Sequence, residues 1–98
     1  MYWRDTMAKK EKARQQYKCV VIQWVDINSF DGAWLDIKES KKLEPVNMET
    51  IGWIIHETKD YVVVVSTLDS SGDLAGSTNA IPKGIITKII PLKYGKSS

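Results

Sequence analysis

The run YVVVV at residues 61–65 is the feature that most constrains what this chain can fold into. Its residues are aromatic or β-branched, and such side chains favour the pleated, half-buried surface of a β-strand. A strand this apolar would pair with another chain if its edges stayed open. The rest of the sequence is therefore expected to supply strands that lie beside it.

Four further segments carry strand signals. The run CVVIQWV at residues 19–25 is apolar on both faces, and TIGWIIHET at residues 50–58 places Ile51, Trp53 and Ile55 on one face. Residues 76–81 form a weaker, polar strand that is typical of a sheet edge, and IITKIIPL at residues 85–92 closes the series. The pattern predicts five short strands.

Turn residues separate these strands. A tight link is predicted at residues 59–60, a hairpin turn at SSGD (70–73) and a 3₁₀ turn at residues 82–84. One long loop, from Asp26 to Glu49, precedes the second strand, and residues 36–43 within it form a short helix or an irregular segment. This order predicts an all-β fold, a small five-stranded SH3-like barrel. The alternative is an open meander that completes its core by dimerising.

Alternation along the strands predicts the core and the domain organisation. We expect a basic N-terminal arm at residues 1–17, flexible or helical, the barrel at residues 18–93 and a disordered tail at residues 94–98. The predicted core consists of apolar residues from four strands: Val20, Ile22, Trp24, Trp53, Ile55, Val63, Val65, Ile86 and Ile89.

Charge is distributed unevenly along the chain. Residues 1–18 carry six basic and two acidic residues, a net charge of +4, whereas residues 19–98 have a net charge of −2. A basic arm attracts nucleic acid through its phosphates, and it is equally compatible with a solvated terminus. Met7 is a plausible translation start, which would make residues 1–6 an upstream extension. The residues for the nucleic-acid hypothesis are Lys9, Lys10, Lys12, Arg14 and Lys18.

Composition excludes several classes of function. One cysteine and one histidine allow neither an internal disulfide nor the common zinc frameworks, and no apolar run reaches the roughly 18 residues of a membrane span. Cys19 and His56 lack a third partner for nucleophilic catalysis, and the acidic residues after Asp26 miss the register of a calcium loop. We expect a cytoplasmic protein that is not an enzyme and has no cofactor, no metal and no membrane contact.

Aromatic residues supply the candidate binding surface. Trp24 and Trp53 fall within apolar strands and are predicted to be buried, whereas Trp34 lies in the long loop. Exposed tryptophan and tyrosine are enriched in protein interfaces. The predicted partner-binding residues are Phe30, Trp34 and Tyr61.

Two resemblances add to this picture. The segments QWVDINSFDGAW (23–34) and GWIIHETKDYVVVVSTLDSSGDLAGSTNAIPKG (52–84) resemble small uncharacterised proteins of tailed bacteriophages and prophages. The layout of GWIIHETKDYVVVV and AIPKGIITKIIPL is distantly similar to Sm-like RNA-binding barrels, without their Gly signatures in the RNA-contacting loops. The phage resemblance implies a location in the host cytoplasm.

These observations lead to a leading hypothesis and an alternative. The leading hypothesis is a nonenzymatic binding module of phage or prophage type that engages a host protein or associates with its own copies. The alternative is a protein that binds RNA or DNA through the basic arm and the aromatic residues of the barrel.

Overall fold

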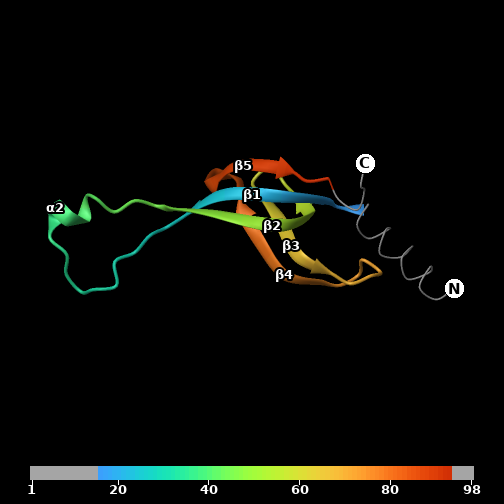
Figure 1. The fold of residues 1–98 in the computed structure, drawn as a ribbon, viewed down its shortest axis with the longest axis horizontal. Helices are drawn as coiled ribbons and strands as arrows, with labels where there is room; N and C mark the ends of the chain where they lie inside the picture. Colours follow the sequence, from blue (N-terminus) through green and yellow to red (C-terminus); the bar gives the residue numbers. More distant parts are fainter. Residues whose placement is uncertain (1–15, 94–98) are drawn as a thin grey trace.

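The computed structural model describes residues 16–93, which form five β-strands, one short α-helix and one 3₁₀ helix (Figure 1). The α-helix α2 spans Ile37–Ser40 and the 3₁₀ helix η1 spans Lys83–Ile85. The predicted basic arm lies outside the described residues apart from Gln16 and Tyr17, and so does the predicted tail. The strands are β1 (Lys18–Asp26), β2 (Val46–Glu57), β3 (Tyr61–Leu68), β4 (Ala75–Pro82) and β5 (Ile86–Pro91).

All five predicted strands are confirmed, and so is the 3₁₀ turn. The largest difference in bounds is at β2, which begins at Val46, directly after Pro45, rather than at residue 50. Proline cannot donate a ladder hydrogen bond, and the chain enters the sheet as soon as it has passed this residue. The early start matters for the site, because it lengthens the ladder between β1 and β2 as far as the pair Asp26 and Val46.

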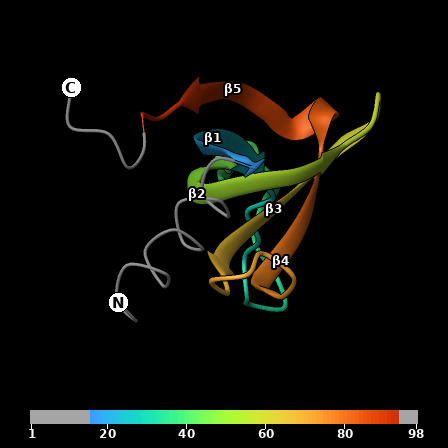
Figure 2. The ribbon, with the colours of Figure 1, turned by 90° about the vertical axis from the view of Figure 1, so that its right-hand side faces the viewer.

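The strands form one antiparallel sheet in the order β4-β3-β2-β1-β5. The prediction of a closed barrel is wrong: β4 and β5 are the two edges of the sheet and do not pair with each other. Figure 2 shows β4 turning through η1 into β5 on the other side of the sheet. The physical reason is that η1 redirects the chain, while Pro82 and Pro91 at the strand ends have no N–H to extend a ladder.

The core lies on one face of this curved sheet. Val62 and Val64 of β3 are completely buried there, where the prediction had placed Val63. A register irregularity between Ile54 and His56 shifts the alternation of β2, so that Ile54 aligns with Val64 and packs on the core instead of Ile55. The buried cluster is Val20, Ile22, Val62, Val64 and Ile81, with Trp24, Ile54, Ile86 and Ile89 packed against it.

Two predicted core residues lie elsewhere. Val65 is completely buried but is not part of the main cluster, because alternate residues of a strand face opposite sides of the sheet. Trp53, which aligns with Val65 across β2 and β3, is half-buried. The second face of the sheet therefore carries apolar side chains as well.

At Gly52, the backbones of β2 and β3 approach too closely to leave room for a side chain. A Cβ atom placed on Gly52 would meet the backbone carbonyl oxygen of Val65 at a distance that real Cβ atoms do not adopt. Because the obstacle is backbone, it cannot move aside as a flexible side chain would. Glycine at this position is what allows the two strands to approach on the core side.

The hairpin turn predicted between β3 and β4 is confirmed. Gly72 takes a positive φ of 82°, and the backbone N–H of Leu74 donates to the Asp69 carboxylate at 2.7 Å. The Ser71 hydroxyl also donates to Asp69, and these hydrogen bonds hold the pKa of that carboxyl below its ordinary value. The turn is thus stabilised by its own side chains.

Candidate functional site

The segment between β1 and β2 departs from the sheet entirely. Residues 27–45, which we call the projecting loop, extend away from the strands and carry α2 at their far end (Figure 1). Every residue of the projecting loop is exposed, with Trp34 at 93% and Ile27 at 82% of their full accessible surface. Its exposed large apolar residues are Ile27, Phe30, Trp34, Leu35, Ile37 and Leu43.

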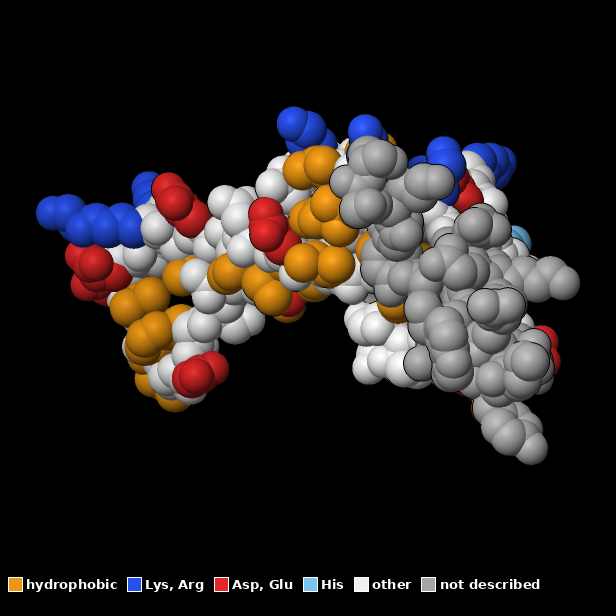
Figure 3. All heavy atoms as spheres, turned by 45° about the vertical axis from the view of Figure 1, so that its right-hand side comes forward, with side chains coloured by type: hydrophobic (Ala, Val, Ile, Leu, Met, Phe, Trp, Pro, Cys, Tyr) orange, Lys and Arg blue, Asp and Glu red, His pale blue; other side chains and the backbone are white. Residues whose placement is uncertain are grey.

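These side chains make an unusual surface. Trp34 and Phe30 together present roughly 300 Å² of aromatic area, and the whole set presents on the order of 700 Å². Exposed apolar groups of this kind often mark interaction sites. In Figure 3, apolar side chains gather at the far end of the projecting loop and again where it joins the sheet.

Local hydrogen bonds shape the far end of the projecting loop. The Asp36 carboxylate caps α2 by accepting a hydrogen bond from the Glu39 backbone N–H at 2.8 Å. Glu39 also pairs with Lys42 one turn later, with 3.1 Å between Oε1 and Nζ. The Phe30 ring lies against Gly32, where a Cβ atom would collide with it. The tip is therefore a defined turn, although it buries no residue.

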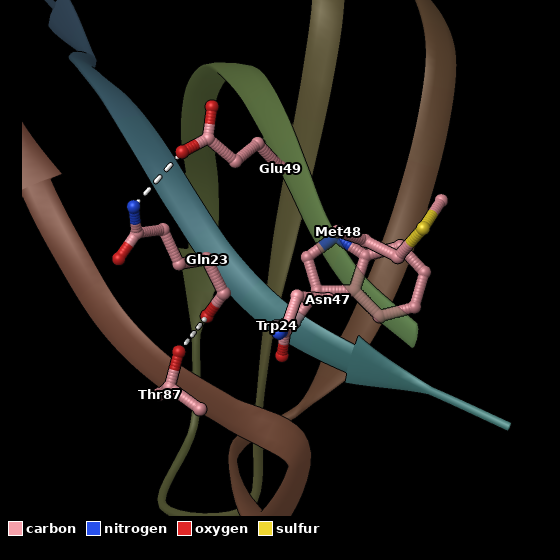
Figure 4. A pocket seen from close by; sticks show the side chains of 6 residues that line it. All are labelled: Gln23, Trp24, Asn47, Met48, Glu49 and Thr87. Atoms are coloured by element: carbon pink, nitrogen blue, oxygen red, sulfur yellow. Dashed lines mark hydrogen bonds between the residues drawn. The ribbon is translucent and has the colours of Figure 1, made fainter. Parts of the chain in front are cut away.

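A groove lies where the projecting loop joins the sheet. Its volume is about 470 Å³, and its walls come from β1, β2 and β5. Its lining side chains, drawn in Figure 4, are Gln23, Trp24, Asn47, Met48, Glu49 and Thr87. We call this feature the base groove.

The strand register explains the walls of the base groove. Gln23 aligns with Lys88 and Trp24 with Ile86, so Thr87 is an extra residue in β5. The Thr87 hydroxyl donates to the Gln23 carbonyl oxygen at 3.1 Å, which fixes this bulge against β1 (Figure 4).

Polar contacts fix the side chains around Trp24. The indole Nε1 donates to the Thr50 hydroxyl at 2.9 Å, and the Gln23 amide donates to the Glu49 carboxylate at 2.8 Å. Across the ladder from Trp24 lies Met48, which is 37% exposed. Trp24 and Met48 lie on one face of the ladder and the Gln23–Glu49 pair lies on the other, because successive residues of a strand face opposite sides.

Trp24 also lines a second, smaller hollow of about 170 Å³ on its other side. That hollow lies between Trp24 and Thr50 on one side and residues of β4 and η1 on the other, namely Asn79, Ala80, Ile81, Pro82 and Ile85. The prediction that Trp24 is buried is thus correct only in part: its ring packs on the core and is half-exposed to two hollows.

The structure separates the predicted partner-binding residues. Phe30 and Trp34 share the projecting loop, whereas Tyr61 begins β3, is 37% exposed and has its ring centroid 6.2 Å from that of His56. Trp34 is too exposed to pack against Tyr61. Ile27, Ile37, Trp24 and Met48 were not among the predicted partner-binding residues. For Ile27, Ile37 and Met48, the available signal was an apolar side chain in the long loop predicted from Asp26 to Glu49.

The residues of the nucleic-acid hypothesis are nearly all outside the described part of the chain. Lys18 is exposed at the start of β1, while Lys9, Lys10, Lys12 and Arg14 lie in residues 1–15. That hypothesis stays a prediction.

Cys19 and His56 are not arranged as a nucleophile and its base. Cys19 aligns with Trp53 across β1 and β2, whereas His56 aligns with Val63 of β3. Burial raises the pKa of the Cys19 thiol, which disfavours the reactive thiolate. Among residues 16–93, no group of three or more His, Cys, Asp or Glu side chains is placed to hold a metal ion.

Comparisons of the chain with protein-family models, with curated proteins and with solved structures find no match. The resemblances to phage proteins and to Sm-like barrels therefore stay predictions. In the described part of the chain, no helix has the length and apolar character that a membrane crossing requires.

Proposed function

We propose that this chain is a nonenzymatic protein-binding module, in which the sheet is a rigid base and the projecting loop is the surface that contacts the partner. One observation carries the proposal: Trp34, Ile27 and Ile37 are 93%, 82% and 73% exposed on a segment that adds nothing to the core. Exposing such residues to water is unfavourable, and burial against a partner recovers that free energy.

The fold supports the proposal in a second way. We interpret the sheet as an open form of the SH3-like architecture, because a long first loop, a hairpin meander and a 3₁₀ turn before the last strand occur in that order. Small barrels of this kind commonly display binding loops on a compact scaffold. The phage or prophage type and the cytoplasmic location rest on the sequence alone.

Site-specific photo-crosslinking tests the proposal. A benzophenone amino acid at Ile37, in the projecting loop, should trap a protein partner when cells that express the full chain are irradiated. The matched control carries the same amino acid at Thr78, an exposed residue of β4. Equal adduct yields at the two positions would contradict the proposal.

Substitution of Trp34 by alanine provides a quantitative readout. Because its side chain is 93% exposed, Trp34→Ala should leave the free energy of unfolding within about 0.5 kcal/mol of the natural chain. Crosslinking from Ile37 should nevertheless fall several-fold, since central aromatic residues dominate interface energies. A large drop in melting temperature would show that Trp34 serves the fold, and unchanged crosslinking would show that it is not a contact.

The nucleic-acid alternative is separated by its salt dependence. Binding through the basic residues of the arm must weaken as salt rises, because it releases counterions from phosphate. A gel-shift assay with short RNA and DNA at two salt concentrations distinguishes the two hypotheses. Trp34→Ala should weaken binding through the projecting loop and leave salt-dependent binding through the arm unchanged.

A further inference from the structure

The two edge strands of the sheet, β4 and β5, lie along its opposite borders (Figure 1). The outer N–H and C=O groups of an edge strand can pair with a strand of another chain, and natural sheets interrupt such edges. The usual means are a charged side chain, a proline or a β-bulge. The two edges of this sheet differ in which of these means they carry.

The β5 edge carries all three. Lys88 is exposed within the strand, Thr87 forms the bulge against β1, and Pro91 at the end has no N–H. With six residues, β5 is also the shortest of the five strands. Addition of a further strand to β5 is therefore disfavoured by its own sequence.

The β4 edge carries no charged side chain. Its eight residues, AGSTNAIP, include no Lys, Arg, Asp or Glu, and its proline is the last residue, Pro82. An extended strand of this length offers roughly 26 Å of edge, at about 3.3 Å per residue. Such an edge would accept another strand unless its backbone were interrupted.

The backbone of β4 is interrupted at Ser77. Among the described residues, Ser77 is the one non-glycine residue with a positive φ, which is 55°. This left-handed conformation is unfavourable for a residue that has a Cβ atom. The ladder between β3 and β4 pairs Thr67 with Gly76 and Val65 with Thr78, and it omits Ser77 between them. Regular pairing is thus lost within the strand.

Ser77 adds nothing to the hairpin turn or to the core. The hydrogen bonds of the turn end at Leu74, and Ser77 is exposed. An extended Ser77 would lie opposite Ser66 and complete the ladder. The Ser77 carbonyl oxygen instead accepts a long hydrogen bond of 3.4 Å from the Asn79 amide of the same strand. A single chain would fold more favourably with an extended Ser77, so the strain indicates a purpose beyond the fold.

We propose that the left-handed Ser77 is an edge-protecting kink, which prevents a strand of another chain from pairing along β4. The kink divides the edge into residues 75–76 and 78–82. Neither part offers the continuous row of N–H and C=O groups that strand addition requires. The proposal does not rest on the proposed function, because it concerns the sheet edge and not the projecting loop.

Substitution of Ser77 in the full chain tests the proposal. Ser77→Thr makes the side chain β-branched, which disfavours a positive φ and favours an extended strand. Ser77→Asn is the matched control, since asparagine is enriched in the left-handed region. Both variants are polar and keep the projecting loop, so a difference between them reports on the backbone at residue 77.

Two measurements compare the variants. Sedimentation velocity over a range of concentrations should show that Ser77→Thr associates with itself several-fold more strongly than the natural chain, whereas Ser77→Asn matches the natural chain. Hydrogen exchange followed by mass spectrometry should show that the β4 amides of Ser77→Thr become more protected as protein concentration rises, because an added strand pairs with the outer N–H groups. Protection of the interior strand β2 should not change with concentration.

Three results of these measurements would overturn the proposal: a Ser77→Thr chain that associates no more than the natural chain, a Ser77→Asn chain that associates as strongly as Ser77→Thr, or association of Ser77→Thr without added protection of β4. Circular dichroism supplies a fourth criterion. A Ser77→Thr chain that is unfolded would also overturn the proposal, because the left-handed residue would then be required by the fold of a single chain.

Discussion

Large apolar side chains form a buried core in the sheet and are exposed in the projecting loop. Ile22 of β1 is completely buried, whereas Ile27, five residues along the chain, is 82% exposed. Val62 and Val64 are likewise completely buried in β3, while Trp34, the bulkiest apolar side chain of the loop, is 93% exposed. The change occurs at Asp26, where the ladder between β1 and β2 ends.

Apolar residues of the sheet and of the loop contribute differently to the stability of the folded monomer. In the sheet they lower the free energy of the folded monomer by leaving water. In the loop they give the monomer no such gain, so folding of a single copy does not account for them. Under the proposed function their burial comes from binding a partner, and the stability of the sheet should be independent of it.

The largest expected effect separates the two regions directly. Ile22→Ala removes buried methyl groups and leaves a cavity, which should cost about 2–5 kcal/mol of unfolding free energy. Ile37→Ala makes the same chemical change at a residue that is 73% exposed, and it should cost less than about 0.5 kcal/mol. Urea unfolding of each variant at a concentration where the chain is monomeric measures both values.

Comparable losses in these two variants would break the distinction between sheet and loop. A loss for Ile37→Ala that grows with protein concentration would sharpen it instead, because a residue buried only in a dimer contributes in proportion to mass action.

The second effect concerns backbone approach within the sheet. Gly52→Ala forces a methyl group against the carbonyl oxygen of Val65, and we expect a loss of about 1–3 kcal/mol, or more if the strands cannot separate. Gly84→Ala in η1 is the matched control, since a Cβ there meets nothing within 4 Å. Thermal melts should show Gly52→Ala lowered by roughly 4–20 °C and Gly84→Ala nearly unchanged. Equal melting temperatures would mean that the close approach at Gly52 is not needed.

The sequence was sufficient to locate the strands and turns. Their signals are local: β-branched runs such as residues 61–65 define strands, and Gly72 with its polar neighbours defines a hairpin. These features depend on residues a few positions apart, so a single sequence contains them.

Whether the sheet closes into a barrel, and which side chains of each strand face the core, could not be predicted in the same way. Whether β4 and β5 meet depends on the curvature of the whole sheet, and the choice between Val63 and Val64 for the core depends on a bulge in β2. A one-residue shift in a strand exchanges its two faces, so a local pattern with an unseen bulge gives the wrong face.

The candidate site was predicted in part. Phe30 and Trp34 were predicted as partner-binding residues because they lie in the long loop and exposed aromatic residues are enriched in interfaces. The structure leaves both exposed. The base groove was beyond reach, because Met48, Trp24 and Thr87 are brought together by strand register over more than sixty residues of chain.

The smallest expected effect is a pH dependence confined to the sheet. The Glu57 carboxylate accepts a hydrogen bond from Lys83 Nζ at 2.7 Å, which links the end of β2 to η1. That hydrogen bond, with the positive charges of Lys83 and Lys18, lowers the pKa of Glu57 below its ordinary value of 4.5. A carboxyl whose pKa is lowered on folding stabilises the protein above its unfolded pKa, and this stabilisation is lost as pH falls through the folded value. Glu57→Gln should therefore melt slightly below the natural chain at pH 7 and equal to it near pH 2. The difference should be small, because the pair is partly exposed to solvent.

The matched control is the ion pair of the projecting loop. Glu39→Gln removes the carboxylate that contacts Lys42 at 3.1 Å, in a segment that is exposed throughout and packs on nothing in the sheet. In the monomer, the melting temperature of Glu39→Gln should match that of the natural chain at every pH. A pH-dependent shift for Glu39→Gln as large as that for Glu57→Gln would mean that the loop unfolds together with the sheet. A shift only for Glu57→Gln would place the cooperative unit in the strands, apart from the projecting loop.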